Sequence, residues 1–133
     1  MKFYIGSGFK NSKIVNEFSK RLKNYGWEHT YNWTENEIGN ETREDLMKYA
    51  TLEQKAIEES DVVIIILPAG RGTHIELGMA LALNKKVYLY SNSQEEFDIE
   101  NTVAFYQLPS VQKIVGNMDE AIGEITKKIK ERL

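Results

Sequence analysis

The longest unbroken apolar run in the chain lies at residues 62–67 and reads Val-Val-Ile-Ile-Ile-Leu. Such a run of strand formers is typical of a central strand that helices cover on both faces. Pro68 has no N–H to donate and ends the strand, and Gly70 and Gly72 permit a sharp turn. Thr73 then stands where a helix N-cap belongs, with unpaired N–H groups pointing outward. The pattern predicts a strand, a glycine loop and a helix start that suits an anion or a polar ligand.

Elsewhere the pattern alternates between strand and helix. Strands are expected at residues 2–6, 27–33, 86–90 and either 103–108 or 111–115, and helices at residues 12–25, 42–59, 75–84 and 117–133. The polar stretch 34–40 predicts an exposed loop that acts as a lid, and 91–100 predicts an irregular turn. The helix at 75–84 is apolar on nearly every side, which indicates deep packing or a subunit interface.

Periodicity also predicts which helix faces are buried. In the first helix Ser12 is expected as the N-cap, with a stripe of Ile14, Phe18, Leu22 and Tyr25. Gly26 is expected to close that helix. The faces expected in the second and last helices are Leu46, Ala50 and Ile57, and Met118, Ile122, Ile125, Ile129 and Leu133.

Short connections between alternating elements imply right-handed crossovers and a parallel sheet. We therefore expect a single α/β domain over residues 1–133, a five-stranded doubly wound sheet of order 2-1-3-4-5 with helices on both faces, like flavodoxin or a Rossmann fold. In that order the first and third strands are neighbours at the switch point. The loop Gly6-Ser7-Gly8-Phe9 and the loop Gly70-Arg71-Gly72-Thr73 would then frame one ligand.

Composition excludes several classes of partner and of site. A formal charge of -3 over 133 residues gives no general attraction to nucleic acid or to anionic membranes. No cysteine is present, which excludes disulfides, thiolate zinc sites and Cys nucleophiles. We expect no metal and no cofactor, because no carboxylates or imidazoles cluster at ligand spacing. With no signal peptide and no apolar stretch long enough to span a bilayer, a soluble cytoplasmic protein is expected.

Glu76 has two interpretations. Thr73-His74-Ile75-Glu76 matches a capping box, in which the Thr hydroxyl and the Glu carboxylate satisfy helix N–H groups. Alternatively, the carboxylate faces the cleft as a nucleophile or charge stabiliser, which suits the oxocarbenium-like transition state of glycosidic cleavage. A cap predicts Glu76 folded back on Thr73, whereas an enzyme predicts it turned into a cleft within reach of Tyr4.

The other candidates also have two interpretations. Asp61 is either a junction residue or a second carboxylate, and a full strand length separates it from Pro68. Tyr4 is either a core residue or a hydrogen-bond donor to the site. Ser7 and Gly8 either form a turn or bind the substrate, and Arg71 is either solvated or binds an anion. His74 is either a surface residue or an acid–base group, and Trp33 either packs in the core or stacks on a base.

Four segments together resemble the nucleoside 2-deoxyribosyltransferase superfamily: Phe3-Tyr4-Ile5-Gly6-Ser7-Gly8-Phe9, Asn32-Trp33-Thr34, Asp61-Val62-Val63, and Gly72-Thr73-His74-Ile75-Glu76-Leu77-Gly78-Met79-Ala80. The resemblance implies that Glu76 is the nucleophile, that Tyr4 orients it and that Asp61 helps the base to leave. Members transfer deoxyribosyl groups between bases or hydrolyse nucleoside monophosphates. They assemble as dimers or hexamers, so a homo-oligomer is expected here, with the apolar helix at its interface.

Two departures bear on the substrate. Transferases of this superfamily usually carry an Asp where this chain has Gly70, and Arg71 adds a cation that a neutral nucleoside does not need. Both favour a phosphorylated substrate. The resulting hypothesis is N-glycosidic cleavage or (deoxy)ribosyl transfer on nucleosides or nucleoside monophosphates through a covalent glycosyl-Glu76 intermediate. The alternatives are a non-catalytic nucleotide sensor of the same fold and a nicotinamide-dinucleotide glycohydrolase.

Overall fold

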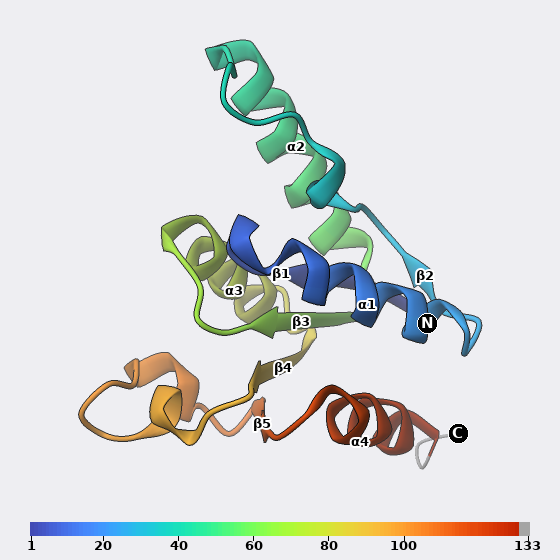
Figure 1. Cartoon of the computed structure of the whole chain (residues 1–133), viewed down its shortest axis with the longest axis vertical. Helices are drawn as coiled ribbons and strands as arrows, with labels where there is room; N and C mark the ends of the chain where they lie inside the picture. The colour runs from blue at the N-terminus through green and yellow to red at the C-terminus, as the bar shows by residue number, and fades with distance from the viewer. Residues whose placement is uncertain (131–133) are drawn as a thin grey trace.

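A five-stranded parallel sheet forms the centre of the molecule (Figure 1). The computed structural model describes residues 1–130, with side chains up to residue 127. The strand order is β2-β1-β3-β4-β5, as predicted. The strands are β1 (Lys2–Gly6), β2 (Glu28–His29), β3 (Val62–Ile66), β4 (Lys86–Ser91) and β5 (Val111–Val115).

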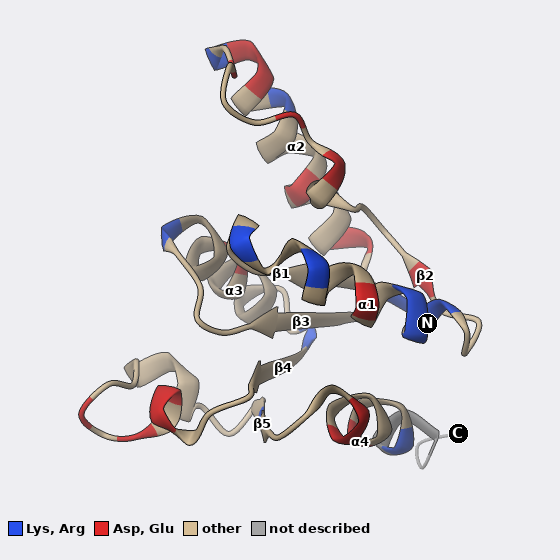
Figure 2. Ribbon diagram, viewed as in Figure 1, with Lys and Arg blue, Asp and Glu red and all other residues tan. Residues whose placement is uncertain are grey.

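Two pairs of helices cover the sheet. The helix α1 (Ser12–Lys23) contacts α4 (Met118–Lys130), and α2 (Arg43–Glu59) contacts α3 (Arg71–Ala82). With right-handed crossovers, α1 and α4 lie on one face and α2 and α3 on the other. Every residue of β3 is buried, as the uninterrupted apolar run predicts. Figure 2 shows the charged residues mainly on helices and loops, which leaves the strands to form the core.

The buried face of α1 differs from the predicted stripe. Val15, Phe18 and Leu22 are buried, whereas Ile14 is 36% exposed and Tyr25 is 48% exposed. Asn11 occupies the N-cap position, and Ser12 is the first helical residue, with its hydroxyl donating to the Phe9 carbonyl at 2.5 Å. The helix was therefore predicted correctly, but its buried face is rotated by about one residue from the predicted one. In a short helix the apolar residues are compatible with more than one choice of buried face.

The edges of the sheet were also predicted imperfectly. The second strand has only two residues, and Trp33 lies instead in a short 3-10 turn, η2 (Trp33–Glu35). The fifth strand is the later of the two alternatives, because residues 103–108 hold the 3-10 turn η4 (Ala104–Gln107). Another turn, η3 (Gln94–Phe97), lies in the predicted irregular stretch. For the last helix, residues 131–133 and the side chain of Ile129 lie outside the described part.

The helix α2 projects from the body of the molecule (Figure 1). Thr42 caps it in a capping box with Asp45. Ile57 near its inner end is buried, but the predicted face fails at the outer end, where Leu46 is 56% exposed and Ala50 is also exposed. The outer half therefore extends past the sheet and borders a cavity.

The start of α3 corrects another prediction. Gly70 is the N-cap and the helix begins at Arg71, so Thr73 is already inside the first turn. On this helix Leu77 and Ala80 are buried, while Ile75 and the C-cap residue Leu83 are 61% and 47% exposed. The helix therefore buries one face and leaves apolar side chains on another. Within residues 1–130, no helix combines the length and apolar character needed to cross a bilayer.

Candidate active site

Three side chains from different elements meet at the carboxyl-terminal end of the sheet. Tyr4 comes from β1 and is fully buried. Its hydroxyl donates a short hydrogen bond to Glu76 Oε2 on α3 and lies 3.2 Å from Glu53 Oε1 on α2. A phenol has a single proton, so satisfying both contacts requires another proton on one of the carboxyl groups. The arrangement is a pair of acids bridged by a phenol.

The position of Glu76 excludes the capping box. No side chain caps α3, and Glu76 lies beyond the first turn, counted from Gly70 as N-cap. Its carboxylate lies instead against β1, where a Cβ added to Gly6 would come within 3.1 Å of Glu76 Oε1. The cap interpretation of Glu76 is therefore wrong, and a glycine at residue 6 leaves room for the carboxylate.

Burial dominates the electrostatics of this pair. It raises the pKa of Glu76 to about 8, while the Tyr4 hydroxyl opposes the rise and the Glu53 carboxylate adds to it. Burial also raises the pKa of Tyr4 far above its usual value, and the charges of Glu76 and Glu53 reinforce that effect. Tyr4 therefore stays protonated and acts as a hydrogen-bond donor.

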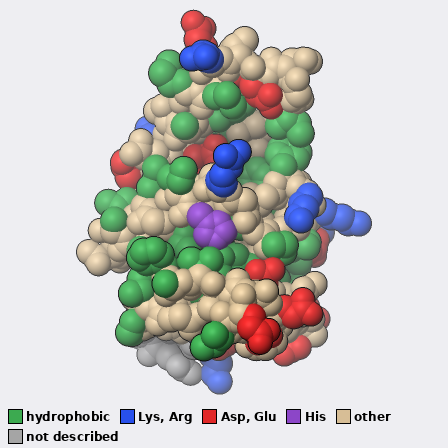
Figure 3. Space-filling view, turned by 90° about the vertical axis from the view of Figure 1, so that its left-hand side faces the viewer, with side chains coloured by type: hydrophobic (Ala, Val, Ile, Leu, Met, Phe, Trp, Pro, Cys, Tyr) green, Lys and Arg blue, Asp and Glu red, His purple; other side chains and the backbone are tan. Residues whose placement is uncertain are grey.

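A cavity of about 480 Å³ opens over these groups, a size that suits a small-molecule ligand. Figure 3 shows this face, with a hollow that has acidic atoms inside it and hydrophobic side chains along its walls. Glu53 and Glu76 line the cavity together with seven of the predicted substrate-binding residues: Ser7, Gly8, Phe9, Trp33, Gly70, Gly72 and Thr73. The two glycine loops therefore frame one cleft, as the strand order implies.

Several lining groups are already engaged with the protein. The Ser7 hydroxyl donates to the Ile66 carbonyl at 2.8 Å and accepts from Asn11 Nδ2 at 2.8 Å. The Trp33 indole N–H donates to the Ile5 carbonyl at 2.6 Å. Trp33 therefore has no N–H left for a ligand, and its ring lies tilted against the ring of Phe9, with their centroids 5.9 Å apart.

Arg71 lies outside the cavity lining, on the exposed first residue of α3. Its side chain makes no hydrogen bond and no ion pair with the other described residues. Its neighbours Gly70 and Gly72 line the cavity, so the cation stands next to the cavity at the positive end of a helix dipole. The structure thus leaves Arg71 available to an anion.

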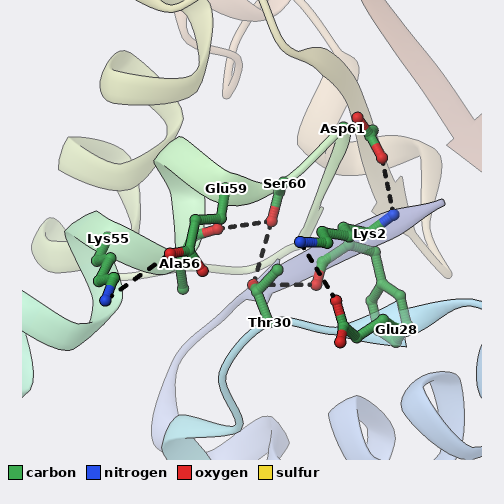
Figure 4. A network of polar contacts seen from close by, with 9 residues as sticks. Lys2, Glu28, Thr30, Lys55, Ala56, Glu59, Ser60 and Asp61 are labelled. Carbon is green, nitrogen blue, oxygen red and sulfur yellow. Dashed lines mark hydrogen bonds and ion pairs between the residues drawn. The ribbon is translucent and has the colours of Figure 1, made fainter.

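Asp61, considered from the sequence as a second carboxylate of the site, lies elsewhere in the structure. It precedes β3, and Val62 pairs with Phe3, so Asp61 lies at the end of the sheet where the parallel strands begin. Its carboxylate accepts from the Lys2 backbone N–H at 2.8 Å, within the polar network of Figure 4. The intervening strand is roughly 16 Å long at 3.3 Å per residue. Asp61 therefore lies at the opposite end of β3 from the glycine loop, and it is not among the residues that line the cavity.

The second carboxylate of the site is Glu53, which the sequence analysis missed. It lies in a helix with several other acidic residues, and no motif distinguishes it from Glu58 or Glu59. The available signal is its spacing, because Glu53 precedes the buried Ile57 by four residues and so shares the inner face of α2. A carboxylate on that face needs a partner, and Tyr4 provides one.

The residues that the structure describes include no group of three or more His, Asp or Glu side chains placed to hold a metal ion. The polar groups in the cavity are carboxyl, hydroxyl, amide and backbone groups. This arrangement supports acid–base and nucleophilic chemistry by carboxyl groups.

Comparisons with known proteins agree with this fold. A solved structure titled CMP N-glycosidase BcmB, from Clostridium botulinum, is 21% identical with a TM-score of 0.68 over 95% of this chain and 99% of that chain. The 2-deoxyribosyltransferase of Bacillus psychrosaccharolyticus is 24% identical with a TM-score of 0.64, over 76% of this chain and 80% of that one. A search of curated proteins found no match.

The nucleoside 2-deoxyribosyltransferase family is matched over residues 3–123. That range contains β1 with Tyr4, α2 with Glu53 and α3 with Glu76. It also includes the other strands of the sheet and the first six residues of α4, and so accounts for most of the chain. The chain belongs to the nucleoside 2-deoxyribosyltransferase family.

Proposed function

We propose that this protein breaks the N-glycosidic bond of nucleosides or nucleoside monophosphates, with Glu76 as the nucleophile. The observation that carries the proposal is the Glu76 carboxyl group, turned into the cavity and held by the Tyr4 hydroxyl. An oxocarbenium-like transition state is stabilised by a carboxylate that is fixed in place before the substrate arrives. Membership of the family supports the same bond type.

The separation of the two carboxyl groups favours retention of configuration. Both hydrogen-bond to the same oxygen, so their nearest oxygens lie within the sum of two hydrogen bonds, about 6 Å. Retaining glycosidases hold their carboxyl groups about 5 to 5.5 Å apart, and inverting enzymes hold them farther apart to admit a water. Glu76 and Glu53 therefore suit a double displacement.

The steps follow from the shared proton. Burial favours the proton on Glu76, so the reaction begins when that proton passes to Glu53, and the Glu76 carboxylate then attacks the anomeric carbon. The carbon–nitrogen bond breaks and its electron pair leaves with the base, which takes a proton from Glu53. Water or a second base then attacks the same carbon, Glu53 takes the proton from that nucleophile, and Glu76 leaves as a carboxylate. Tyr4 donates to Glu76 throughout and sets its orientation.

A 5′-phosphate on the substrate fits the glycine loop between β3 and α3. Arg71 is unpaired within the described residues, and it lies at the helix N-terminus next to Gly70 and Gly72. A guanidinium with five donors and a helix dipole both favour phosphate. A nucleoside monophosphate is therefore the proposed substrate class, with Arg71 as its phosphate contact.

Base release tests the proposal. The panel contains nucleosides, deoxynucleosides and their monophosphates, with and without an acceptor base, and compares the unmodified protein with Glu76→Gln and the matched control Glu58→Gln. We expect release with the unmodified protein and the control, and none with Glu76→Gln. Arg71→Gln should raise KM for a monophosphate about tenfold and leave a nucleoside unaffected.

The opposing outcomes are distinct. Turnover by Glu76→Gln at the unmodified rate would rule out the covalent step. Nucleotide binding without turnover by the unmodified protein would replace the enzyme with a nucleotide sensor. If Arg71→Gln changed KM equally for a nucleoside and for its monophosphate, Arg71 would not be the phosphate contact.

We also propose a homo-oligomer that covers the apolar groove between α3 and η4. The groove measures about 610 Å³, and Ile75, Phe105 and Leu108 on its walls are 61%, 62% and 39% exposed. Apolar surface of this kind commonly marks an interface. Light scattering should report more than one chain per particle, and Phe105→Glu should lower that number. A monomer under native conditions would contradict the assignment.

A further inference from the structure

His74 connects the glycine loop of the active site to a distant part of the chain. Its Nδ1 lies 2.7 Å from the Gly70 carbonyl, and its Nε2 lies 2.7 Å from the Tyr106 hydroxyl on η4. The two rings stack at 5.9 Å with 12° between their planes. Tyr106 is 3% exposed and packs edge-on against Phe97, so the phenol is itself fixed.

The directions of the two hydrogen bonds follow from their partners. A carbonyl oxygen can only accept, so Nδ1 of His74 carries a proton and donates to Gly70. In a neutral ring Nε2 is then the acceptor and the Tyr106 hydroxyl is the donor. The Gly70 carbonyl also accepts from the His74 backbone N–H at 3.2 Å. One residue therefore holds the N-cap carbonyl of α3 with two donors.

The glycine turn has open space beside it. A Cβ added at Gly70 or at Gly72 would meet nothing within 4 Å among the described residues, so the space on that side of each glycine is open. The preceding residues are held from the other side, where Ser7 bonds the Ile66 carbonyl at 2.8 Å and Asn11 bonds the Pro68 carbonyl at 3.3 Å. His74 is the corresponding tie on the α3 side.

We propose that His74 and Tyr106 are positioning residues that fix the Gly70–Gly72 turn in the shape that binds substrate. Neither is a catalytic residue, since neither lines the carboxylate cavity. Through this connection the segment between β4 and β5 acts on a site built from earlier elements. The kinetic consequence rests on the proposed function, whereas the effect on the turn itself does not.

Matched substitutions separate the two hydrogen bonds. The side-chain amide of Asn places a nitrogen near the position of Nδ1, and that of Gln places one near Nε2. We therefore expect His74→Asn to keep the bond to Gly70, and His74→Gln to lose it while keeping a contact to Tyr106. Tyr106→Phe removes the anchor of the ring alone, and Phe105→Leu is the control in the same segment.

Two NMR measurements test the turn without any substrate. Long-range ¹H–¹⁵N spectra of the imidazole should show His74 as the Nδ1-protonated tautomer. Backbone ¹⁵N order parameters of Gly70 to Gly72 should fall most in His74→Gln, which loses the bond to Gly70. They should fall less in Tyr106→Phe and His74→Asn, which lose only the contact between residues 74 and 106, and stay unchanged in Phe105→Leu. An Nε2-protonated ring, or equal order parameters in all four variants, would overturn the proposal.

Kinetics with the best substrate of the base-release panel provide the third measurement. His74→Gln and Tyr106→Phe should raise KM about three- to tenfold, the effect of one lost hydrogen bond, and change kcat less than about twofold. His74→Asn keeps the bond to Gly70, so it should raise KM less than His74→Gln does. A fall in kcat with unchanged KM, or the same rise in KM in His74→Asn as in His74→Gln, would mean a structural role only and would contradict the assignment. If no substrate turns over, the NMR result still decides.

Discussion

Replacing Glu76 by Gln should make the folded protein more stable, even though it removes the proposed nucleophile. The folded protein holds the pKa of Glu76 at about 8, whereas an exposed Glu ionises near 4.5. Below pH 4.5 the Glu76 side chain is neutral in the folded and the unfolded state, so its burial lowers the free energy of unfolding little. As the pH rises from 4.5 to 8, the unfolded chain ionises first, so stability is lost over that interval.

The size of the effect follows from the two pKa values. Each pH unit between them corresponds to about 1.4 kcal/mol, so the full difference from 4.5 to 8 amounts to about 5 kcal/mol. At pH 7, still below the folded value, the cost to the unmodified protein is about 3 kcal/mol. Gln is neutral at every pH and its carbonyl still accepts from Tyr4, so Glu76→Gln avoids this cost.

Urea unfolding at a series of pH values measures the difference. The two proteins should have equal free energies of unfolding near pH 4, and Glu76→Gln should gain about 3 kcal/mol at pH 7, or about 10 °C in Tm. Glu58→Gln, on the exposed side of α2, should run parallel to the unmodified protein. If the curve of Glu76→Gln also runs parallel, burial does not hold Glu76 neutral in the folded protein.

Three further predictions concern neighbouring groups. Tyr4→Phe removes a hydrogen bond that lowers the pKa of Glu76, so the acid limb of the pH–rate profile should move up by about one unit or more; an unmoved limb would exclude Tyr4 as its donor. Gly6→Ala brings a methyl group within 3.1 Å of Glu76 Oε1 and should lower kcat by about tenfold or more and stability by about 1 to 3 kcal/mol; unchanged kinetics would show that the carboxylate can move aside. Burial, with a smaller contribution from Lys23, lowers the pKa of His29 to about 4 from 6.5, so the unfolded chain binds a proton first as the pH falls, and about 3 kcal/mol of stability should be lost between pH 6.5 and 4. Urea unfolding of His29→Gln should lack that loss, and an unchanged pH dependence would place its origin elsewhere.

The sheet could be predicted from the sequence because its evidence is local and repeated. The apolar run of β3 and the short connections around it define a parallel sheet, and the handedness rule then restricts the strand order. The phase of a helix is a weaker signal. In α1 the choice between Ile14 and Val15 as the inward residue depends on where the helix lies on the sheet, which no local pattern records.

The candidate site was predictable where its residues adjoin a glycine turn. Gly70, Gly72 and Glu76 lie within one short segment, and the first loop follows β1 directly. Glu53 could not be found in the same way, because its role depends on α2 crossing over Tyr4. Asp61 shows the opposite error, since a carboxylate beside the right strand lies at the wrong end of it.

The projecting helix α2 makes the position of Glu53 sensitive to distant contacts. With Ile57 as a pivot, Glu53 lies four residues away and Leu46 eleven residues away, or about 6 Å and about 16 Å along the axis. A lateral push of about 1.5 Å at Leu46 therefore moves Glu53 by about 0.5 Å. That displacement is enough to lengthen its 3.2 Å contact with Tyr4 beyond hydrogen-bonding range. A contact at the outer end of α2 is therefore transmitted to Glu53, and it changes how Glu53 and Glu76 share their proton through Tyr4.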